Sequence, residues 1–320
     1  MSKATMDYLA SLPDSEVAID LRNVTKDYGG GRGIFDITLR VPKGSTFGYC
    51  GTNGAGKTTT LRHIMGFIKP DKGTVKVSGL DPRKQGEEIK KSIGYLPGEI
   101  AFPALENGSQ FLKSQADLIN LTDMSKAEKI INMFQLDPTA NLRRMSKGMK
   151  QKTAIVAAFM HSPNLILLDE PTTGLDPLMR EAFIDLIEEE KARGATILMS
   201  NHMFDELDET CDYVAFIREG RIIDIVSMEE IHNRPFREYV LSFSEEGAYE
   251  TAFKDGFEVQ GRFKDNNAIL VKVDLAKTHE FLSELKNYRL RSVNEFRYTL
   301  ERYFMEQFGG AINGSDSSAN

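Results

Sequence analysis

The sequence predicts an α/β domain with a mostly parallel sheet, followed by a smaller α+β domain. Across residues 17–232, short β-rich runs alternate with helical patterns, which is typical of α/β domains. Residues 165–168, LILL, are continuously apolar, as a strand buried on both faces should be. The pattern changes after Arg234, and a chain of 320 residues is long enough for two domains.

Segments rich in β-branched and aromatic residues mark the strands of the first domain. They are residues 17–24, 35–41, 45–50, 73–77, 92–96, 164–169, 195–199 and 213–217. Between residues 106 and 145 this pattern stops, and helical periodicity takes over, as in 111–119. We therefore expect the first domain to span residues 17–234, with a helical subdomain at about 106–160.

The second domain is expected at residues 235–309. Its segments read in the order strand, helix, strand, strand, helix, strand, which is the order of a ferredoxin-like unit, and a last helix follows. Residues 1–16 carry acids and lack an apolar run, so they are expected to form a flexible tail. Residues 310–320 are rich in Gly and Ser and are expected to be disordered.

Composition narrows the classes of function. The chain has 40 basic and 47 acidic residues and a net charge of −7, which argues against a general nucleic-acid binder. Cys50 and Cys211 lie far apart without metal-ligand spacing, which favours buried thiols in a reducing cytosol. The longest apolar runs fall well short of the ~20 residues that a membrane-spanning helix needs, so we expect a soluble chain.

Residues 51–59, GTNGAGKTT, lie between an apolar strand and a helical pattern, which is the context that a phosphate-binding loop requires. Its glycines let the backbone close around phosphate oxygens, Lys57 reaches the β- and γ-phosphates, and the Thr58 hydroxyl binds Mg²⁺. The expected nucleotide-binding residues are Gly51, Asn53, Gly54, Ala55, Gly56, Lys57, Thr58 and Thr59.

Two carboxylates, Asp169 and Glu170, end the apolar strand at residues 165–170. Ligands bind at the carboxyl ends of parallel strands, and successive strand residues point in opposite directions. One carboxylate is therefore expected to face Mg²⁺ and the other the attacking water. Such a pair is more often a solvated strand end, but the phosphate-binding loop in the same chain favours the functional reading.

Residues 143–152, RRMSKGMKQK, form a basic stretch at the predicted start of a helix. Ser146 can cap that helix, and its free N-terminus together with arginines and lysines favours an anion. The phosphate-binding loop lies nearly a hundred residues earlier, which leaves open whose anion this is.

With these motifs the chain resembles the nucleotide-binding subunit of an ATP-binding-cassette (ABC) transporter, most closely the drug and antibiotic exporter type. The likeness covers residues 19–231, and the most specific stretch is 145–178. There Ser146 and Gly148 match the signature, the acidic pair matches the metal and base positions, and residues 174–176 match the D-loop.

The resemblance implies further roles. Tyr28 would stack on adenine and His202 would contact the γ-phosphate, although a half-buried tyrosine and a structural histidine are the plainer readings. Two subunits, identical or paralogous, would pack head to tail, so that the signature of one meets the ATP of the other. The residues acting in trans would be Ser146, Lys147, Gly148 and Asp176. Lys147 replaces the family's glycine, and a solvated lysine is an equal alternative to phosphate contact.

Gly98 departs from the family pattern, because it stands where the Q-loop glutamine would contact Mg²⁺. Either water completes the metal shell or Glu99 swings in, and water is the favoured reading.

The function implied is an MgATP-dependent ATPase subunit that drives export through a separate transmembrane permease, on the cytoplasmic face of the membrane. Residues 101–106 would line the groove for the permease, or be plain core. The alternative is a soluble ABC-type ATPase that acts as a nucleotide switch. An intact Glu170 argues against a pure switch, which needs no catalytic base.

Overall fold

The computed structural model describes residues 2–253 and 256–309. Its contacts divide the chain into Met1–Met228, here unit 1, and Glu229–Asn320, here unit 2. The division falls a few residues before residue 234, where the sequence pattern changes.

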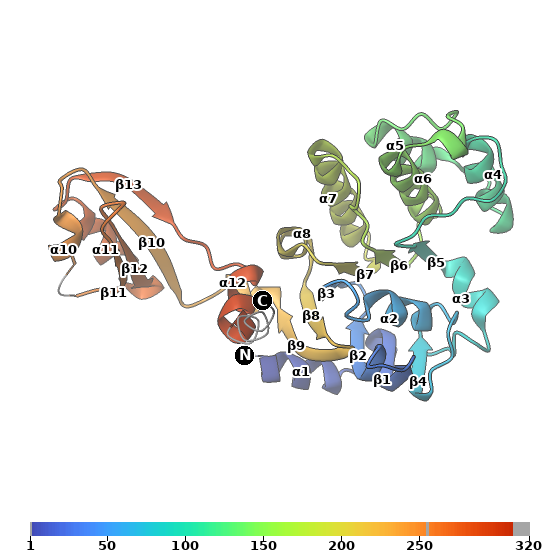
Figure 1. Cartoon of the computed structure of the whole chain (residues 1–320), viewed down its shortest axis with the longest axis horizontal. Coiled ribbons are helices and arrows are strands. Elements are labelled where there is room, and N and C mark those ends of the chain that lie inside the picture. The colour runs from blue at the N-terminus through green and yellow to red at the C-terminus, as the bar shows by residue number, and fades with distance from the viewer. Residues whose placement is uncertain (1, 254–255, 310–320) are drawn as a thin grey trace. The chain divides into compact units, whose positions relative to one another are not determined.

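A six-stranded sheet forms the centre of unit 1, in the order β5-β6-β7-β3-β8-β9 (Figure 1). Its strands are β3 (Thr46–Cys50), β5 (Ile93–Leu96), β6 (Leu165–Asp169), β7 (Thr196–Asn201), β8 (Tyr213–Arg218) and β9 (Arg221–Ser227). All neighbours pair in parallel except β8 and β9. The carboxyl ends of β3, β6 and β7 therefore meet at one edge, where the predicted phosphate-binding loop and acidic pair lie.

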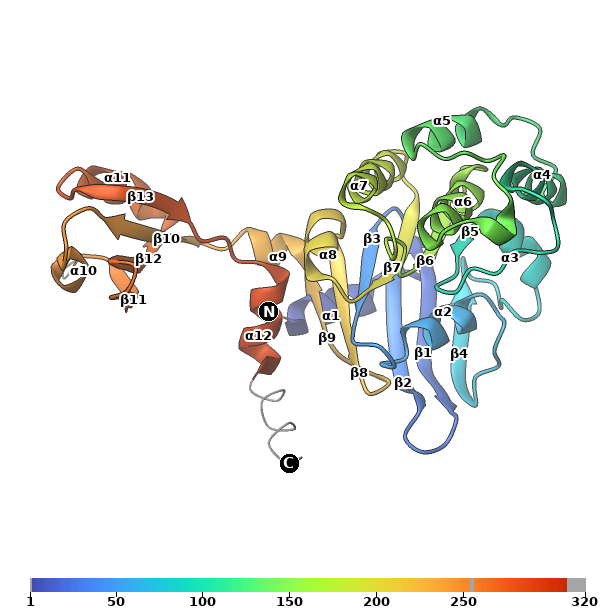
Figure 2. The same ribbon diagram turned by 45° about the horizontal axis from the view of Figure 1, so that its top comes forward.

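The sequence predicts a mostly parallel sheet, and three of the segments assigned to it instead form a second sheet in unit 1. β1 (Val17–Asp27), β2 (Gly33–Pro42) and β4 (Lys72–Val77) pair antiparallel in the order β2-β1-β4, side by side in Figure 2. The physical reason is the short glycine-rich connection between β1 and β2, since a tight hairpin can join only antiparallel strands.

Helices complete unit 1. α2 (Lys57–Ile64) follows β3, and α3 (Gly86–Ser92) precedes β5. The segment predicted to be a helical subdomain contains α4 (Gly108–Leu118), α5 (Ser125–Met133), the short 3₁₀ turn η2 (Leu142–Arg144) and α6 (Lys147–Phe159). The three α-helices lie together in Figure 1. α7 (Pro177–Ala192) and α8 (Phe204–Thr210) follow β6 and β7.

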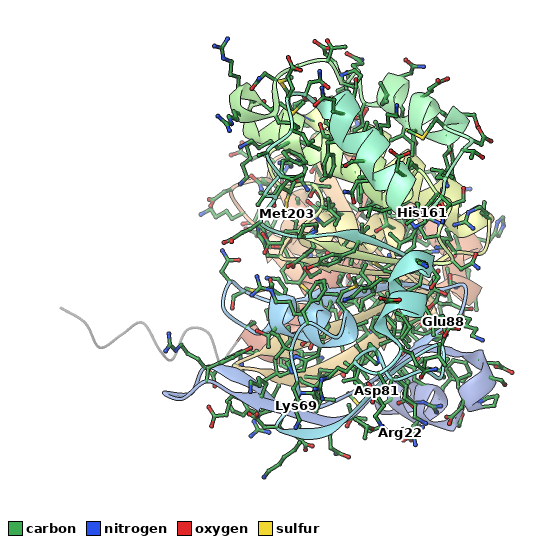
Figure 3. All side chains as sticks on the ribbon, turned by 90° about the vertical axis from the view of Figure 1, so that its right-hand side faces the viewer. Arg22, Lys69, Asp81, Glu88, His161 and Met203 are labelled. Carbon is green, nitrogen blue, oxygen red and sulfur yellow. The ribbon has the colours of Figure 1, made fainter. Side chains whose placement is uncertain are left out.

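The two sheets and α2 share one apolar core. Ile19 and Leu39 from the antiparallel sheet, Phe47 and Leu198 from the larger sheet, and Leu61 from α2 belong to the same buried cluster. Figure 3 shows the side chains that fill unit 1 between the antiparallel sheet, which carries Arg22, and the region of His161. Packing on both sides fixes α2, and with it the loop that precedes it.

The N-terminal segment is not a flexible tail, so that expectation for residues 1–16 is wrong. It forms α1 (Ser2–Ser11) and the 3₁₀ turn η1 (Asp14–Glu16), and α1 packs on β9 and β2. Leu9 is buried in the core of unit 1. Arg40 of β2 donates to the carbonyls of Ala10 and Leu12 at 2.8 and 2.7 Å, which satisfies the free C-terminal end of α1.

Unit 2 contains a four-stranded antiparallel sheet in the order β11-β12-β10-β13. Its elements are α9 (Met228–His232), which spans the division, β10 (Phe236–Phe243), α10 (Ala248–Thr251), β11 (Glu258–Phe263), β12 (Ala268–Asp274), η3 (Leu275–Lys277), α11 (Thr278–Leu285), β13 (Leu290–Glu295) and α12 (Leu300–Phe308). Its core is rich in stacked rings, such as Phe253 on Tyr288 and Tyr239 on Phe281. Residues 310–320, expected to be disordered, lie outside the described residues.

Candidate nucleotide-binding site

An open cavity of about 500 Å³ lies at the carboxyl edge of the six-stranded sheet. It brings together most of the residues that the sequence assigns to a nucleotide, together with four that it does not. The lining residues are Tyr28, Arg32, Gly33, Asn53, Gly54, Gly56, Lys57, Thr58, Thr59, Gly98, Glu99, Asp169 and Glu170.

The loop between β3 and α2 has the tight backbone expected of a phosphate-binding loop. Gly56 has φ +109°, and a Cβ there would lie 2.7 Å from Ile34. A Cβ at Gly51 would lie 2.4 Å from the carbonyl oxygen of Ile217. Gly51 and the buried Ala55 do not line the cavity, so they support the loop from behind.

Lys57 lies along this loop. It is 5% exposed, and its Nζ donates to the carbonyls of Gly51 at 2.7 Å and Thr52 at 3.3 Å. Its Nζ is also 3.3 Å from Oε1 of Glu170. The ammonium group is thus held between the loop backbone and Glu170.

Asp169 and Glu170 face different partners, as expected, but Glu170 lies just after the end of β6, so strand alternation is not the reason. Asp169 is 1% exposed, and its Oδ1 accepts from Oγ of Ser200 at 2.5 Å. Glu170 has left-handed backbone with φ +50°, which turns its carboxylate toward the cavity, where Oε1 lies 3.7 Å from Nδ1 of His202. His202 does not line the cavity itself but borders it through Glu170.

The second carboxylate oxygen of Asp169, Oδ2, is buried and has no hydrogen-bond partner among the described residues. Buried carboxylate oxygens without a partner are rare, and such an atom points to a ligand. Thr58 lines the same cavity, so a hydroxyl and a free carboxylate oxygen are available for Mg²⁺. Among residues 2–253 and 256–309, no cluster of three or more His, Cys, Asp or Glu side chains could hold a metal ion.

Gly98 lies directly beside that oxygen. A Cβ at this position would be 3.0 Å from Oδ2 and 3.2 Å from Cγ of Asp169. Gly98 does not have a positive φ, so close packing rather than backbone strain disfavours a side chain here. Glu99 lines the cavity next to it.

Tyr28 stands at the other end of the cavity, in the hairpin between β1 and β2. Its ring is 48% exposed, and Nζ of Lys26 lies 5.8 Å from the ring centroid. Lys26 also pairs with Asp71 at 2.7 Å, which raises the pKa of Lys26 above its usual value. An exposed ring supported from one side is available for stacking on a base.

A hydrogen-bonded network beneath His202 was missed by the sequence reasoning. Oε2 of the buried Glu206 accepts from Thr172 at 2.6 Å and from Asn201 at 2.5 Å. Oδ1 of Asn201 in turn accepts from the backbone N–H groups of His202 and Met203. The network connects the segment after Glu170 to the turn that carries His202. The sequence does not predict this network, because a carboxylate four residues after a histidine is too weak a pattern.

The four residues assigned to a partner's nucleotide do not line this cavity. Ser146 caps α6, as predicted, by accepting from the N–H of Met149 at 3.2 Å. Asp176 caps α7 in the same way, by accepting from the N–H of Met179 at 3.0 Å.

Gly148 and Lys147 pack against the D-loop. A Cβ at Gly148 would lie 2.8 Å from the carbonyl oxygen of Gly174, and a Cβ at Gly174 would lie 3.2 Å from the Lys147 side chain. The signature and the D-loop therefore form one surface. Lys147 also lines a separate cavity of about 390 Å³ with Glu99, Lys150, Gln151, Gly98 and Ile100.

Comparisons with known proteins agree with this geometry. The model of the ABC transporter family matches residues 34–173. The bacitracin transport ATP-binding protein BcrA of Bacillus licheniformis is 32% identical over 229 residues, which are 70% of this chain and 75% of BcrA. The chain belongs to the ATP-binding proteins of ABC transporters. As a member of this family it binds ATP and is an ATPase.

A second relative matches this ABC protein over more of its length, and a solved structure resembles its fold. The ABC transporter ATP-binding protein YtrB of Bacillus subtilis is 29% identical over 298 residues, 91% of this chain and 98% of YtrB. A solved structure described as an ATP binding subunit of an ABC transporter has a TM-score of 0.61 and 29% identity, and covers 67% of this chain and 92% of its own. The resemblance inferred from the motifs, to an ATP-binding subunit of the exporter type, is confirmed.

In residues 2–253 and 256–309 of this ABC protein, no helix is both long and apolar enough to cross a membrane.

Proposed function

We propose that the chain hydrolyses ATP to drive the export of a cargo through a separate transmembrane permease, held at the cytoplasmic face of the membrane by that permease. The observation that carries the proposal is the single cavity lined by Tyr28, the phosphate-binding loop and the acidic pair. The name of BcrA, a bacitracin transport protein, supports export of the antibiotic type.

Five residues of the cavity, and His202 beside it, take different parts in nucleotide binding and hydrolysis. Tyr28 stacks on the base, and Lys57 binds the β- and γ-phosphates. Glu170 orients the attacking water and accepts its proton, while His202, 3.7 Å from Glu170, binds the γ-phosphate. Thr58 and Oδ2 of Asp169 would hold Mg²⁺, which would supply positive charge beside the phosphates.

The signature residues act on the ATP of a second subunit, identical or paralogous. Ser146, Lys147 and Gly148 lie at the N-terminus of α6, which favours an anion, yet they do not line the cavity of their own chain. Asp176 belongs to the D-loop surface that packs beside them. A head-to-tail dimer, closed by two ATP molecules, accounts for this separation.

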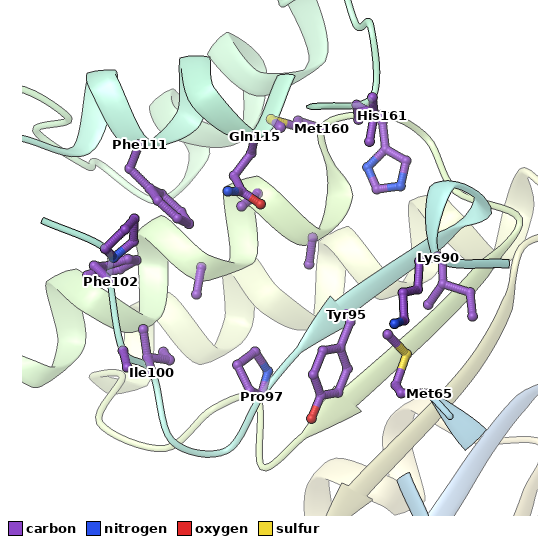
Figure 4. Close-up of a pocket in the computed structure, with 17 residues that line it drawn as sticks. Met65, Lys90, Tyr95, Pro97, Ile100, Phe102, Phe111, Gln115, Met160 and His161 are labelled. Atoms are coloured by element: carbon purple, nitrogen blue, oxygen red, sulfur yellow. The ribbon is translucent and has the colours of Figure 1, made fainter. Parts of the chain in front are cut away.

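The permease docks in an apolar groove of unit 1. A cavity of about 430 Å³ is lined by Ala101, Phe102 and Pro103 from the predicted segment, and by residues of β5, α4 and α6 (Figure 4). Ala104, Leu105 and Glu106 of that segment do not line it. Phe102 and Phe111 form an edge-to-face pair at one end, and Tyr95 and His161 lie toward the other, so the groove suits a short helix with an apolar face.

We infer that unit 2 is a ferredoxin-like domain. Its elements follow the order strand, helix, strand, strand, helix, strand, and the first strand lies between the third and the fourth in the sheet. Regulation and dimer support are both roles that such a domain can have.

A mixing experiment tests the trans arrangement. Lys57→Ala impairs phosphate binding by the phosphate-binding loop, and Ser146→Arg impairs the signature segment. In a mixed dimer one composite site carries both changes and the other carries neither, so ATPase activity should partly return on mixing. If the signature served its own subunit's ATP, both sites would be damaged and mixing would restore nothing.

A further inference from the structure

Arg32 is a cationic residue of the nucleotide cavity that no motif assigns. It lines the cavity together with Tyr28 and the phosphate-binding loop. The side chain is exposed, and its guanidinium has no hydrogen-bond or ion-pair partner among the described residues. The sequence reasoning passed over it because one arginine in a glycine-rich turn carries no specific pattern.

The hairpin loop holds Arg32 close to Tyr28. The N–H of Tyr28 donates to the carbonyl of Arg32 at 2.9 Å, and the N–H of Arg32 donates to the carbonyl of Gly29 at 3.2 Å. The N–H of Gly29 donates in turn to Oδ1 of Asp27 at 2.7 Å. Both ends of the turn are therefore tied, and the backbone of Arg32 is fixed beside the stacking ring.

Gly33, the residue after Arg32, connects the hairpin loop to the phosphate-binding loop. A Cβ at Gly56 would lie 3.3 Å from the carbonyl oxygen of Gly33, so the two backbones are in close contact. A Cβ at Gly33 would lie 2.0 Å from the carbonyl oxygen of Lys26, so only glycine fits there. Arg32 thus lies at the junction between the ring that stacks on the base and the loop that holds the phosphates.

The two cations of the cavity differ in their partners. Lys57 is engaged by two carbonyls of its own loop and lies 3.3 Å from Glu170. Arg32 is engaged by no carboxylate, although Glu99, Asp169 and Glu170 line the same cavity. A guanidinium without a partner beside a phosphate site matches phosphate oxygens in geometry and charge.

We propose that Arg32 binds the phosphate chain of ATP on the side of Tyr28, and so joins the base and phosphate ends of the site. The proposal rests on the nucleotide cavity assigned above. A charge-assisted hydrogen bond at a partly exposed position corresponds to a change of about 10-fold in the dissociation constant.

The test uses the full chain and measures the dissociation constants of ATP and GTP by titration calorimetry at several salt concentrations. The variants are Arg32→Gln and Arg32→Lys, with Arg83→Gln as the control, since Arg83 is exposed and does not line the cavity. Arg32→Gln should weaken ATP and GTP alike, by about 10-fold at low salt. The weakening should shrink as salt rises, because salt screens the lost charge. Arg32→Lys should retain part of the affinity, and Arg83→Gln should match the wild type.

Three results would overturn the proposal. Unchanged ATP affinity in Arg32→Gln would exclude a contact. A loss that is independent of salt would mean that Arg32 only shapes the loop around Tyr28. A loss for ATP but not for GTP would place the contact at the base.

Lys57→Ala separates this proposal from the cavity assignment. If Lys57→Ala weakens ATP binding while Arg32→Gln leaves the dissociation constant of ATP unchanged, only the proposal for Arg32 fails. If the wild-type chain and Lys57→Ala bind ATP equally, the cavity assignment itself fails.

Discussion

Two buried carboxylates, Glu238 in unit 2 and Asp169 in unit 1, differ in how completely they are hydrogen-bonded. In unit 2, Glu238 is 4% exposed and both of its oxygens accept from the guanidinium of Arg302. In unit 1, Asp169 is 1% exposed, yet only Oδ1 has a partner. Both groups lose hydration, and only one recovers it fully inside the protein. The fully paired carboxylate of Glu238 stabilises the fold, whereas the unpaired Oδ2 belongs to a residue that lines the nucleotide cavity and is therefore suited to a ligand.

The largest expected effect concerns Glu170, the residue next to Asp169 in the nucleotide cavity. Glu170→Gln removes the proposed general base but keeps the shape of the side chain, so turnover should fall by ~10² to 10⁴ while MgATP still binds. Phosphate release and nucleotide binding measured on the same preparation check this. Turnover near the wild-type rate would show that another group accepts the proton.

The structural side of the contrast predicts a loss of stability in unit 2. Glu238→Ala leaves the guanidinium of Arg302 without its partner and should cost about 1 to 3 kcal/mol, since Arg302 is 23% exposed and partly hydrated. Hydrogen exchange of the β10 and β12 amides measures this for unit 2 alone.

Asp169→Asn is the matched change in unit 1, because it also removes a buried negative charge. It should leave stability unchanged or raise it by up to about 1 kcal/mol, while activity is lost. Equal destabilisation by Glu238→Ala and Asp169→Asn would contradict the distinction between the two carboxylates.

Gly98 gives a smaller test of the space beside Asp169. Gly98→Ala adds a Cβ 3.0 Å from Oδ2, so Asp169 must shift by a few tenths of an ångström, which should disturb the proposed Mg²⁺ ligand more than the fold. The Mg²⁺ concentration for half-maximal hydrolysis should rise several-fold, while the melting temperature changes little. Gly86→Ala is the control, because the nearest atom to its added Cβ is 3.9 Å away. A normal Mg²⁺ requirement in Gly98→Ala would show that Asp169 has more freedom than its packing indicates.

The smallest expected signal concerns the thiols. Burial raises the pKa of Cys50 and of Cys211 to about 12, so very little thiolate exists at pH 8 and neither thiol should react with iodoacetamide in the native protein. Both should react after unfolding in urea. The folded pKa of each thiol lies above its ordinary value of 9.0, so the unfolded chain loses these protons at lower pH than the folded chain does. The free energy of unfolding is therefore unaffected by the thiols below pH 9 and decreases as the pH rises from 9 toward 12. Rapid labelling of the native chain would show that the core around β3 opens.

The sequence predicts much of the fold because strands and phosphate-binding loops depend on local pattern. The segment at residues 164–169 and the loop at 51–59 are recognisable from apolar runs and glycine spacing alone. The antiparallel pairing of β1 with β2 was missed, although the glycines after Tyr28 signal a hairpin.

Contacts between distant segments account for the other differences. α1 was read as a tail because its anchor, Arg40, lies in another element, and a guanidinium that caps a helix leaves no mark in the helix itself. Glu206 and Arg32 were missed for the same reason, since their importance comes from the groups that the fold places around them.

The docking of α1 has a consequence for how the chain can be shortened. β9 is an edge strand of the six-stranded sheet, and α1 packs on it while Leu9, Met6 and Leu12 pack against the core of unit 1. A chain that starts at Val17 would keep every catalytic residue but expose this apolar surface next to an open strand edge. Such edges template association with other chains, so the shortened protein should form aggregates during purification even though its nucleotide site is complete.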